Sequence, residues 1–292
     1  MNRSQEAIVG IDLGGTNVRV GKVRGEELER RHAQRISGHE SKEHVLEEVF
    51  QATDQVFDEE VVGIGCCVPS IVDVDRGIVY AVENIPSWRR VFLKDEIEKR
   101  YDVPAHVNND ANAFALGELH FGQGRGYRNI VGLTLGTGLG AGIIIDGHLY
   151  CGSNCGAGEI GSLPYKDHTL EHYCAGQFFK SKTGESGEMI FEQAQQGDPH
   201  ALQIYHEYGS EVGHAVMTAL YAYDPELIVL GGSISKAYAF FESGMRERLK
   251  DYDYQHALER LVIENTENEN IAILGAVALF LEAGNRDENG NA

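Results

Sequence analysis

The sequence is poor in several residue types, and each shortage excludes a class of protein. Its 292 residues include only 6 prolines but 35 glycines, so the glycines are expected in turns rather than in a low-complexity linker. Lysine and arginine total 25 against 45 aspartates and glutamates, a formal net charge of −20. This charge argues against binding to nucleic acid or to an anionic membrane, since both need a basic surface. A salt-rich host and a simple solubility bias would both explain it.

Long apolar segments are also lacking. Residues 2–6 are polar and offer no hydrophobic core for a signal peptide, and no apolar run approaches the length of a transmembrane helix. We therefore expect a cytoplasmic protein.

Cysteines are few and odd in number: Cys66, Cys67, Cys151, Cys155 and Cys174. Without a secretory signal, reduced thiols are the expected state. The four-residue spacing of Cys151 and Cys155 resembles half of a metal site. No second cysteine or histidine pair follows at zinc-finger spacing, so structural zinc is not expected.

A glycine-rich segment near the start is the most informative feature present. Residues 8–20 read as a strand, a glycine turn and a second strand, with Asp12 at the end of the first strand. Glycine lets a phosphate reach backbone N–H groups because no Cβ blocks it. A carboxylate beside a phosphate is the usual way to hold Mg²⁺ through its water shell. An ordinary hairpin with a glycine turn is the alternative.

The pattern recurs at residues 130–142, where Ile, Val, Gly, Leu and Gly stand at the same offsets. Such a repeat predicts two similar halves facing each other across a cleft. The chain has no Gly-Lys-Ser/Thr ending of a P-loop. The second glycine cluster leads into an apolar run rather than a helix, which argues against a dinucleotide fingerprint.

Periodicity predicts a mixed α/β order of elements. After the first hairpin we expect a short strand at 19–24, a helix at 43–57, a buried strand at 61–68, a short helix at 94–100 and a strand at 105–107. Asn109 or Asp110 then caps a helix at 111–120, and Asp146-Gly147 makes a hairpin turn. Later elements are helices at 188–196 and 199–222, a strand at 227–230 and a helix at 271–281.

Several motifs together resemble the ROK family of sugar kinases, over most of the chain. The phosphate motifs are Asp12-Leu13-Gly14-Gly15-Thr16 and residues 136–142, and Leu230-Gly231-Gly232-Ser233 matches the adenosine loop. Residues 108–113, Asn-Asn-Asp-Ala-Asn-Ala, match the catalytic motif. The sugar-side segments are residues 84–88, 156–161 and 170–173.

The resemblance implies an α/β protein with the two-lobed actin-like ATPase (ribonuclease H-like) fold, built from duplicated βββαβα-type domains around a central cleft. We expect residues 1–108 plus the C-terminal helix 271–283 to form the smaller lobe and residues 109–270 the larger one. Residues 284–292 are expected to be a disordered tail. Related proteins are usually homodimers, so a homodimer is expected here.

Asp110 is the candidate general base, where a strand delivers a loop to the start of a helix. From the residues alone, a simple helix N-cap explains it as well; the resemblance favours catalysis. Phosphoryl transfer needs a positioned hydroxyl, a nearby base and neutralised phosphate charge. An aspartate suffices because a loose transition state needs only late proton acceptance.

The resemblance makes Glu159 and Glu171 the expected sugar ligands, because one carboxylate can accept from two neighbouring hydroxyls. Asn109 can both donate and accept. Asn84 is a further candidate, although a turn-forming asparagine before Ile-Pro explains it equally well. Otherwise Glu159 would be a loop cap and Glu171 an exposed helix charge. Trp88 is expected to pack locally rather than stack on sugar.

The nucleotide side is assigned in the same way, with ATP as the expected phosphoryl donor and polyphosphate as an alternative. Asp12 is expected to hold Mg²⁺ through water. The residues expected to contact the nucleotide are Gly14, Gly15, Thr16, Gly136, Thr137, Gly138, Gly231 and Gly232.

One departure concerns zinc. Most ROK members bind zinc through a histidine after the first glutamate and a cysteine cluster before the second. Here Ser162 takes the histidine position, and residues 164–169 contain no cysteine. A partial ligand set binds metal poorly, so we expect no zinc. In zinc-containing relatives that histidine helps to shape the sugar pocket, which leaves the sugar open.

The expected function is ATP-dependent phosphorylation of a hexose, at the 6-hydroxyl of glucose or a close relative. N-acetylmannosamine or another amino sugar is an alternative. A transcriptional regulator would need an N-terminal winged helix, and Asp12 lies too close to the start to leave room for one. A catalytically inactive sugar sensor and a filament-forming actin relative are further classes, disfavoured by the intact acidic and sugar-binding residues.

Overall fold

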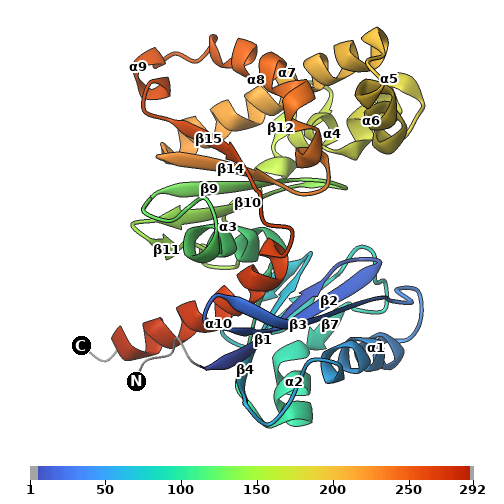
Figure 1. Cartoon of the computed structure of the whole chain (residues 1–292), viewed down its shortest axis with the longest axis vertical. Coiled ribbons are helices and arrows are strands. Elements are labelled where there is room, and N and C mark those ends of the chain that lie inside the picture. The colour runs from blue at the N-terminus through green and yellow to red at the C-terminus, as the bar shows by residue number, and fades with distance from the viewer. Residues whose placement is uncertain (1–5, 290–292) are drawn as a thin grey trace. The chain divides into compact units, whose positions relative to one another are not determined.

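The computed structural model describes residues 6–289, with side chains up to residue 284. The chain forms two compact units. The first unit comprises the described residues up to Arg125, then His148–Ala157 and those from Asn268 onward. The second comprises Gly126–Gly147 and Gly158–Glu267 (Figure 1).

A five-stranded sheet in the order β3-β2-β1-β4-β8 organises the first unit. β1 pairs antiparallel with β2 and parallel with β4, which pairs parallel with β8. The strands are β1 (Ala7–Leu13), β2 (Asn17–Arg24), β3 (Glu27–Arg35), β4 (Val61–Val68) and β8 (Ala105–Asn109). Smaller strands are β5 (Ile71–Asp73), β6 (Ile78–Tyr80), β7 (Arg90–Phe92) and β11 (His148–Leu149). The helices are α1 (Lys42–Asp54), α2 (Leu93–Tyr101), α3 (Asp110–Phe121) and α10 (Ile271–Asn289).

Helix α10 joins the sheet and α3 into one core through very close backbone contacts. A Cβ on Gly65 of β4 would lie 1.7 Å from the carbonyl oxygen of Ala276, and one on Gly275 would lie 2.1 Å from that of Ala113 on α3. Because α3 packs on α10, residues 109–125 belong to the first unit. The predicted lobe boundary after residue 108 therefore differs from the observed one, which falls after Arg125.

The second unit has a sheet in which β10, β9, β14 and β15 are neighbours in that order. These strands are β9 (Ile130–Leu135), β10 (Leu139–Ile145), β14 (Leu227–Gly231) and β15 (Val262–Asn265). A small hairpin joins β12 (Pro164–Tyr165) to β13 (His168–Thr169). The helices are α4 (Leu170–Cys174), α5 (Gly176–Thr183), α6 (Gly187–Gln195), α7 (Pro199–Tyr223), α8 (Tyr238–Leu249) and α9 (Gln255–Leu258). Tyr205 and Tyr208 of α7 and Phe241 of α8 are buried in its core.

Most predicted elements are present within a few residues of their expected bounds. The charged strand β3 was missed. Among its nine residues, none is buried, so it has no apolar alternation to reveal it. Helix α10 continues to Asn289, into the segment 284–292 for which a disordered tail is predicted. A single glycine costs a helix only about 1 kcal/mol, and no proline follows. Residues 290–292 lie outside the described part of the chain.

None of the helices in the described residues is long and apolar enough to span a bilayer. Trp88 is fully buried in the core of the first unit, as expected for a packing residue.

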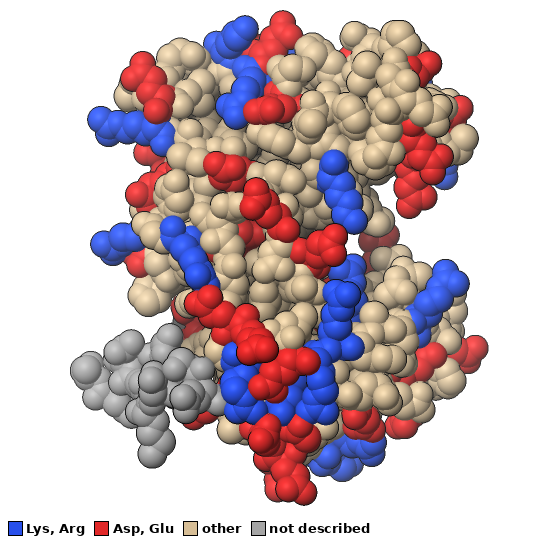
Figure 2. All heavy atoms as spheres, viewed as in Figure 1, with Lys and Arg blue, Asp and Glu red and all other residues tan. Residues whose placement is uncertain are grey.

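Charged side chains of both signs interleave on the face shown in Figure 2, and one ion-pair network is partly buried. The Lys22 ammonium on β2 is 2% exposed and lies 2.8 Å from a carboxylate oxygen of Asp58 and of Glu60. Burial lowers the pKa of Lys22, but the hydrogen bonds that its ammonium donates to these carboxylates raise the pKa overall. The same bonds to Lys22 are the largest cause lowering the pKa values of Asp58 and Glu60.

We expect Lys22→Met to lower the free energy of unfolding of the first unit by about 1–3 kcal/mol at neutral pH. The dependence of this free energy on pH in the acid range should also become weaker. Asp58 and Glu60 have ordinary pKa values of 3.8 and 4.5. Because their folded values are lower, they stabilise the fold above that range, and this contribution is lost as the pH falls through the folded values. Urea unfolding at several pH values measures the difference, with the more exposed Lys42→Met as control. Parallel pH profiles for wild type and Lys22→Met would contradict the assignment.

Candidate active site

The first glycine turn joins β1 to β2 and is held by local contacts. The Gly14 N–H donates to the carbonyl oxygen of Asn17 at 2.9 Å. A Cβ on Gly15 would lie 2.4 Å from the Cβ of Asn84, so the Asn84 side chain lies directly over this turn. Asn84, predicted from a sugar-side motif, is thus next to a predicted phosphate loop within the same unit.

Asp12 stands at the carboxyl end of β1, opposite Cys67 of β4. Its Oδ1 lies 3.6 Å from the Cys67 sulfur, and its Oδ2 lies 3.6 Å from Nε of Arg19. Burial raises the pKa of Asp12 above its ordinary value, and Arg19 and the Cys67 thiol offset only part of that rise. A buried carboxylate is stabilised in its charged form by a nearby cation. A hard oxygen donor suits Mg²⁺, so the residue fits the predicted magnesium role.

Asp110 follows the carboxyl end of β8. β1, β4 and β8 run parallel, and Cys67 pairs with both Asp12 and Asn108. Carboxyl ends of parallel strands lie at one edge of a sheet. Both Asp12 and Asp110 act electrostatically on Cys67, whose pKa is raised first by its burial and then by these charges. The sequence analysis did not identify Cys67 as a neighbour of Asp12. The register of β4 between β1 and β8 places it there.

The helix-cap role falls to Asn109. Its Oδ1 accepts from the N–H groups of Ala111 and Asn112 at 2.8 and 3.3 Å, as an N-cap does. Its Nδ2 donates to the Ser70 carbonyl oxygen at 3.3 Å. Asp110 is exposed, and its Oδ1 accepts from the Ala111 N–H at 2.9 Å. The cap explanation therefore applies to Asn109, whose remaining capacity toward a ligand is as a donor.

The second glycine turn joins β9 to β10 in the second unit. The Gly136 N–H donates to the Gly138 carbonyl oxygen at 3.0 Å. Glu171 on α4 reaches this turn, because its Oε2 accepts from the Leu139 N–H at 2.9 Å. A Cβ on Gly138 would lie 2.5 Å from the same oxygen. Glu171 thus belongs to the loop as well as to the predicted sugar site.

Glu159 lies between Gly158 and Gly161, whose backbones pack closely against β10. Gly158 has φ +93°, and a Cβ there would lie 2.0 Å from the carbonyl oxygen of Ala141, so no other residue fits. Burial raises the pKa of Glu159, and the negative charge of Glu171 raises it further. The two predicted sugar-binding carboxylates are therefore near neighbours.

The predicted adenosine loop follows β14, beside β9. Gly232 has φ +87°, and a Cβ there would lie 2.3 Å from the Leu135 carbonyl oxygen. A Cβ on Gly136 would lie 3.6 Å from Oγ of Ser233. The two predicted nucleotide loops of this unit are consequently adjacent.

Ser162 ends a short 3₁₀ turn (Ile160–Ser162), and the hairpin β12–β13 follows it. Among the described residues there is no group of three or more potential metal ligands. The expected absence of zinc stays a prediction.

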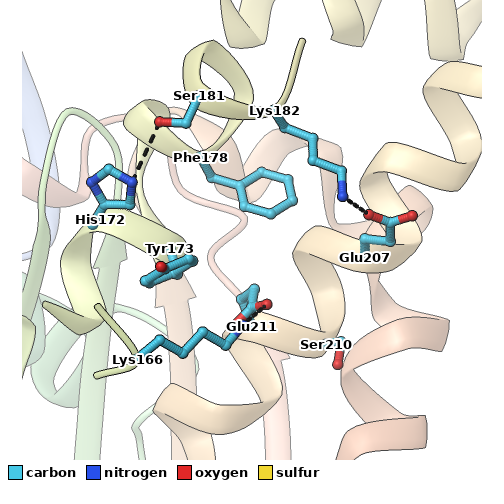
Figure 3. A pocket seen from close by; sticks show the side chains of 9 residues that line it. All are labelled: Lys166, His172, Tyr173, Phe178, Ser181, Lys182, Glu207, Ser210 and Glu211. Carbon is cyan, nitrogen blue, oxygen red and sulfur yellow. Dashed lines mark hydrogen bonds and ion pairs between the residues drawn. The ribbon is translucent and has the colours of Figure 1, made fainter. Parts of the chain in front are cut away.

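A cavity of about 330 Å³ lies beside α4, α5 and α7 (Figure 3). Lys166 pairs with Glu211 at 2.5 Å and Lys182 with Glu207 at 2.7 Å. Both lysine charges are thus neutralised, which disfavours binding of a phosphate. The lining residues are Lys166, His172, Tyr173, Phe178, Ser181, Lys182, Glu207, Ser210 and Glu211; the predicted site residues are not among them.

Comparison with known proteins decides the family. A profile of the ROK family matches residues 8–283. The chain belongs to the ROK family. The chain is 31% identical to a glucokinase of Thermotoga maritima, covering 94% of this chain and 97% of that protein. It is 26% identical to a xylose repressor of Bacillus subtilis, covering 76% and 62%.

Among solved structures, the chain resembles a ROK family glucokinase from Streptomyces griseus in complex with glucose and AMPPNP. The TM-score is 0.80 at 26% identity, covering 94% of this chain and 98% of that one. This ROK protein therefore has the two-lobed actin-like ATPase fold predicted from its motifs.

Proposed function

We propose that this ROK protein transfers the γ-phosphoryl group of ATP to a hexose, at the 6-hydroxyl of glucose or a close relative. The protein is a sugar kinase; the sugar, the hydroxyl and the residue roles are our proposal. The observation that carries it is the electrostatic effect of Glu171 on Glu159, together with the contact of Glu171 with a glycine turn. The first unit offers an exposed Asp110 at the sheet edge where Asp12 also lies.

Asp110 is proposed as the general base. The Asp110 carboxylate is proposed to orient the acceptor hydroxyl and to take its proton late in the transfer, while Asn109 caps α3. Its exposure allows a substrate to reach it.

Sugar recognition is assigned to Glu159 and Glu171, which accept from hydroxyl groups, and to Asn109, which donates through Nδ2. Asn84 is proposed to contact the sugar from its place over the Gly15 turn. These groups have opposite hydrogen-bonding roles, which suits a ligand whose hydroxyls both donate and accept.

The nucleotide is assigned to the glycine turns of both units, where backbone N–H groups can bind phosphate oxygens. Asp12 is proposed to hold Mg²⁺ through water, and the ion would neutralise phosphate charge. The residues assigned to ATP are Gly14, Gly15, Thr16, Gly136, Thr137, Gly138, Gly231 and Gly232.

Glu159 predicts an acid limit to catalysis. Its pKa is raised above the ordinary 4.5, so it loses its charge at a higher pH than a free glutamate. We expect kcat/KM for the sugar to fall as the pH drops through that raised value. Glu159→Gln should have lower activity and lack this acid limb. ADP quantified by chromatography avoids coupling enzymes that titrate themselves. An identical acid limb in Glu159→Gln would exclude Glu159 as its origin.

The proposal is tested by ADP release from Mg-ATP with a panel of hexoses and N-acetylhexosamines, with and without a zinc chelator. Turnover of one sugar, insensitive to the chelator, is expected. If folded protein that binds ATP releases no ADP with any sugar of the panel, the result would favour an inactive sugar sensor or another donor such as polyphosphate.

An amino sugar is the second candidate substrate. Ser162 is exposed and smaller than the histidine of zinc-containing relatives, which leaves room for a bulkier 2-substituent. Faster turnover of N-acetylmannosamine than of glucose in the same panel would favour it.

A further inference from the structure

Two of the five cysteines lie together in the first unit. Cys151 is partly exposed, whereas Cys155 is 3% exposed. The Asn112 amide nitrogen lies 3.8 Å from the Cys151 sulfur and 3.6 Å from the Cys155 sulfur. Cys151 is also the neighbour that most raises the pKa of Cys155.

The segment that carries the pair is tightly turned. The Ala157 N–H donates to the Cys151 carbonyl oxygen at 3.1 Å, which closes the loop on itself. Cys155 has φ +56°, a left-handed conformation that is unfavourable for a residue with a side chain. The turn thus directs both sulfurs to the same amide at a cost in backbone strain.

The pair is connected to the proposed base through Asn108. Asn108 Oδ1 accepts from the Cys155 thiol at 3.2 Å, from Asn112 Nδ2 at 3.0 Å and from the Asn109 N–H at 2.7 Å. Cys155 is therefore hydrogen-bonded to Asn108, the residue two positions before Asp110.

We propose that Cys151 and Cys155 are a redox-active pair that a hydroperoxide oxidises to a disulfide, and that this bond slows phosphoryl transfer by displacing the Asn108–Asp110 segment. The other three cysteines are poor candidates, because all of them are buried. Burial raises the pKa values of Cys66, Cys67 and Cys174, which keeps their thiols unreactive.

The roles within the pair differ. The pKa of Cys155 is raised, first because its thiol hydrogen-bonds to Cys151 and then because it is buried. Cys155 thus retains its proton, and the more accessible Cys151 is the first nucleophile.

The chemistry balances in two steps. The Cys151 thiolate attacks one peroxide oxygen, the O–O bond breaks, and the other oxygen leaves as hydroxide or alkoxide and takes a proton. Cys155 then attacks the sulfur of the resulting sulfenic acid. The S–S bond forms, the S–O bond breaks, and the hydroxyl leaves as water with the Cys155 proton. Two thiols are oxidised and one peroxide is reduced; a dithiol reductant reverses the change.

Oxidation removes the Cys155 donor from Asn108. Asn108 Oδ1 then keeps only the Asn112 and Asn109 donors among the three named above, and the shortened loop pulls Cys155 away from it. The expected loss of turnover rests on the proposed function; formation of the disulfide does not.

The test uses the full-length reduced protein treated with hydrogen peroxide, alkylated and digested for mass spectrometry. A Cys151–Cys155 cross-link is expected in wild type and in Cys174→Ser, and in neither Cys151→Ser nor Cys155→Ser. Circular dichroism confirms that the variants fold. Oxidation of Cys151 to sulfinic acid without a cross-link in wild type would overturn the pair.

Turnover of the sugar found in the panel is measured before oxidation, after it and after dithiothreitol. We expect a loss of kcat of up to about 10²-fold, the effect of misplacing a catalytic group by about 1 Å, and recovery on reduction. A cross-link with unchanged kcat would overturn the effect on transfer. A cross-link in protein that phosphorylates no sugar even when reduced would support the pair and contradict the proposed function.

Discussion

Asp110→Asn is expected to lower kcat by about 10²- to 10⁴-fold while leaving the dissociation constant for the sugar nearly unchanged. The substitution removes the proton acceptor but retains an amide oxygen in its place. That oxygen can still accept from the Ala111 N–H, and Asn109 still caps α3. The fold of the first unit should therefore survive, and the loss should be confined to the chemical step.

The measurement is steady-state kinetics together with sugar binding by calorimetry. Asp95→Asn, an exposed aspartate in the first turn of α2, is the matched control and should behave as wild type. A wild-type kcat in Asp110→Asn would show that another group accepts the proton.

Glu171→Ala is expected to have the second largest effect, because one carboxylate serves two purposes. Its Oε2 accepts from the Leu139 N–H, and the proposal gives it sugar hydroxyls as well. Hydrogen bonds to a charged group contribute about 1.5–3 kcal/mol each, so kcat/KM should fall by about 10- to 100-fold or more. We expect KM to rise for the sugar and, because the glycine turn loosens, for ATP too.

Glu171→Gln separates the two purposes. Its amide oxygen can still accept from Leu139, so KM for ATP should recover while sugar binding stays weakened. Glu259→Ala, an exposed glutamate at the end of α9 in the same unit, is the control. If Glu171→Ala changed neither KM nor kcat, Glu171 would have no place in the site.

The glycine turns and the buried strands could be predicted from sequence because their signals are local. β4 has the predicted bounds, Val61–Val68, since a continuous β-branched run needs no tertiary information. β3 could not be predicted, because its charged residues form a strand only by pairing with β2. The unit boundary after Arg125 could not be read from the sequence, because the contact between Gly275 and Ala113 joins residues far apart in sequence.

Motifs likewise located the candidate site residues but not their contacts. Sequence alone left the helix cap open between Asn109 and Asp110; the hydrogen bonds of α3 decide it. The bond between Glu171 and Leu139 spans 32 positions, and no spacing rule predicts it. The closeness of Cys155 to Asn108 was hidden for the same reason.

Helix α10 has a consequence for how the protein is made. The first unit is discontinuous in sequence, because the helix that packs on its sheet begins only at Ile271. At about 5–20 residues per second, a ribosome needs roughly 7–30 s to travel from the end of α3 to that helix. The apolar face that Gly10, Gly63 and Gly65 present to α10 stays uncovered during that time. The second unit is complete first, so we expect the N-terminal half of the chain to be the last to resist proteolysis on the ribosome.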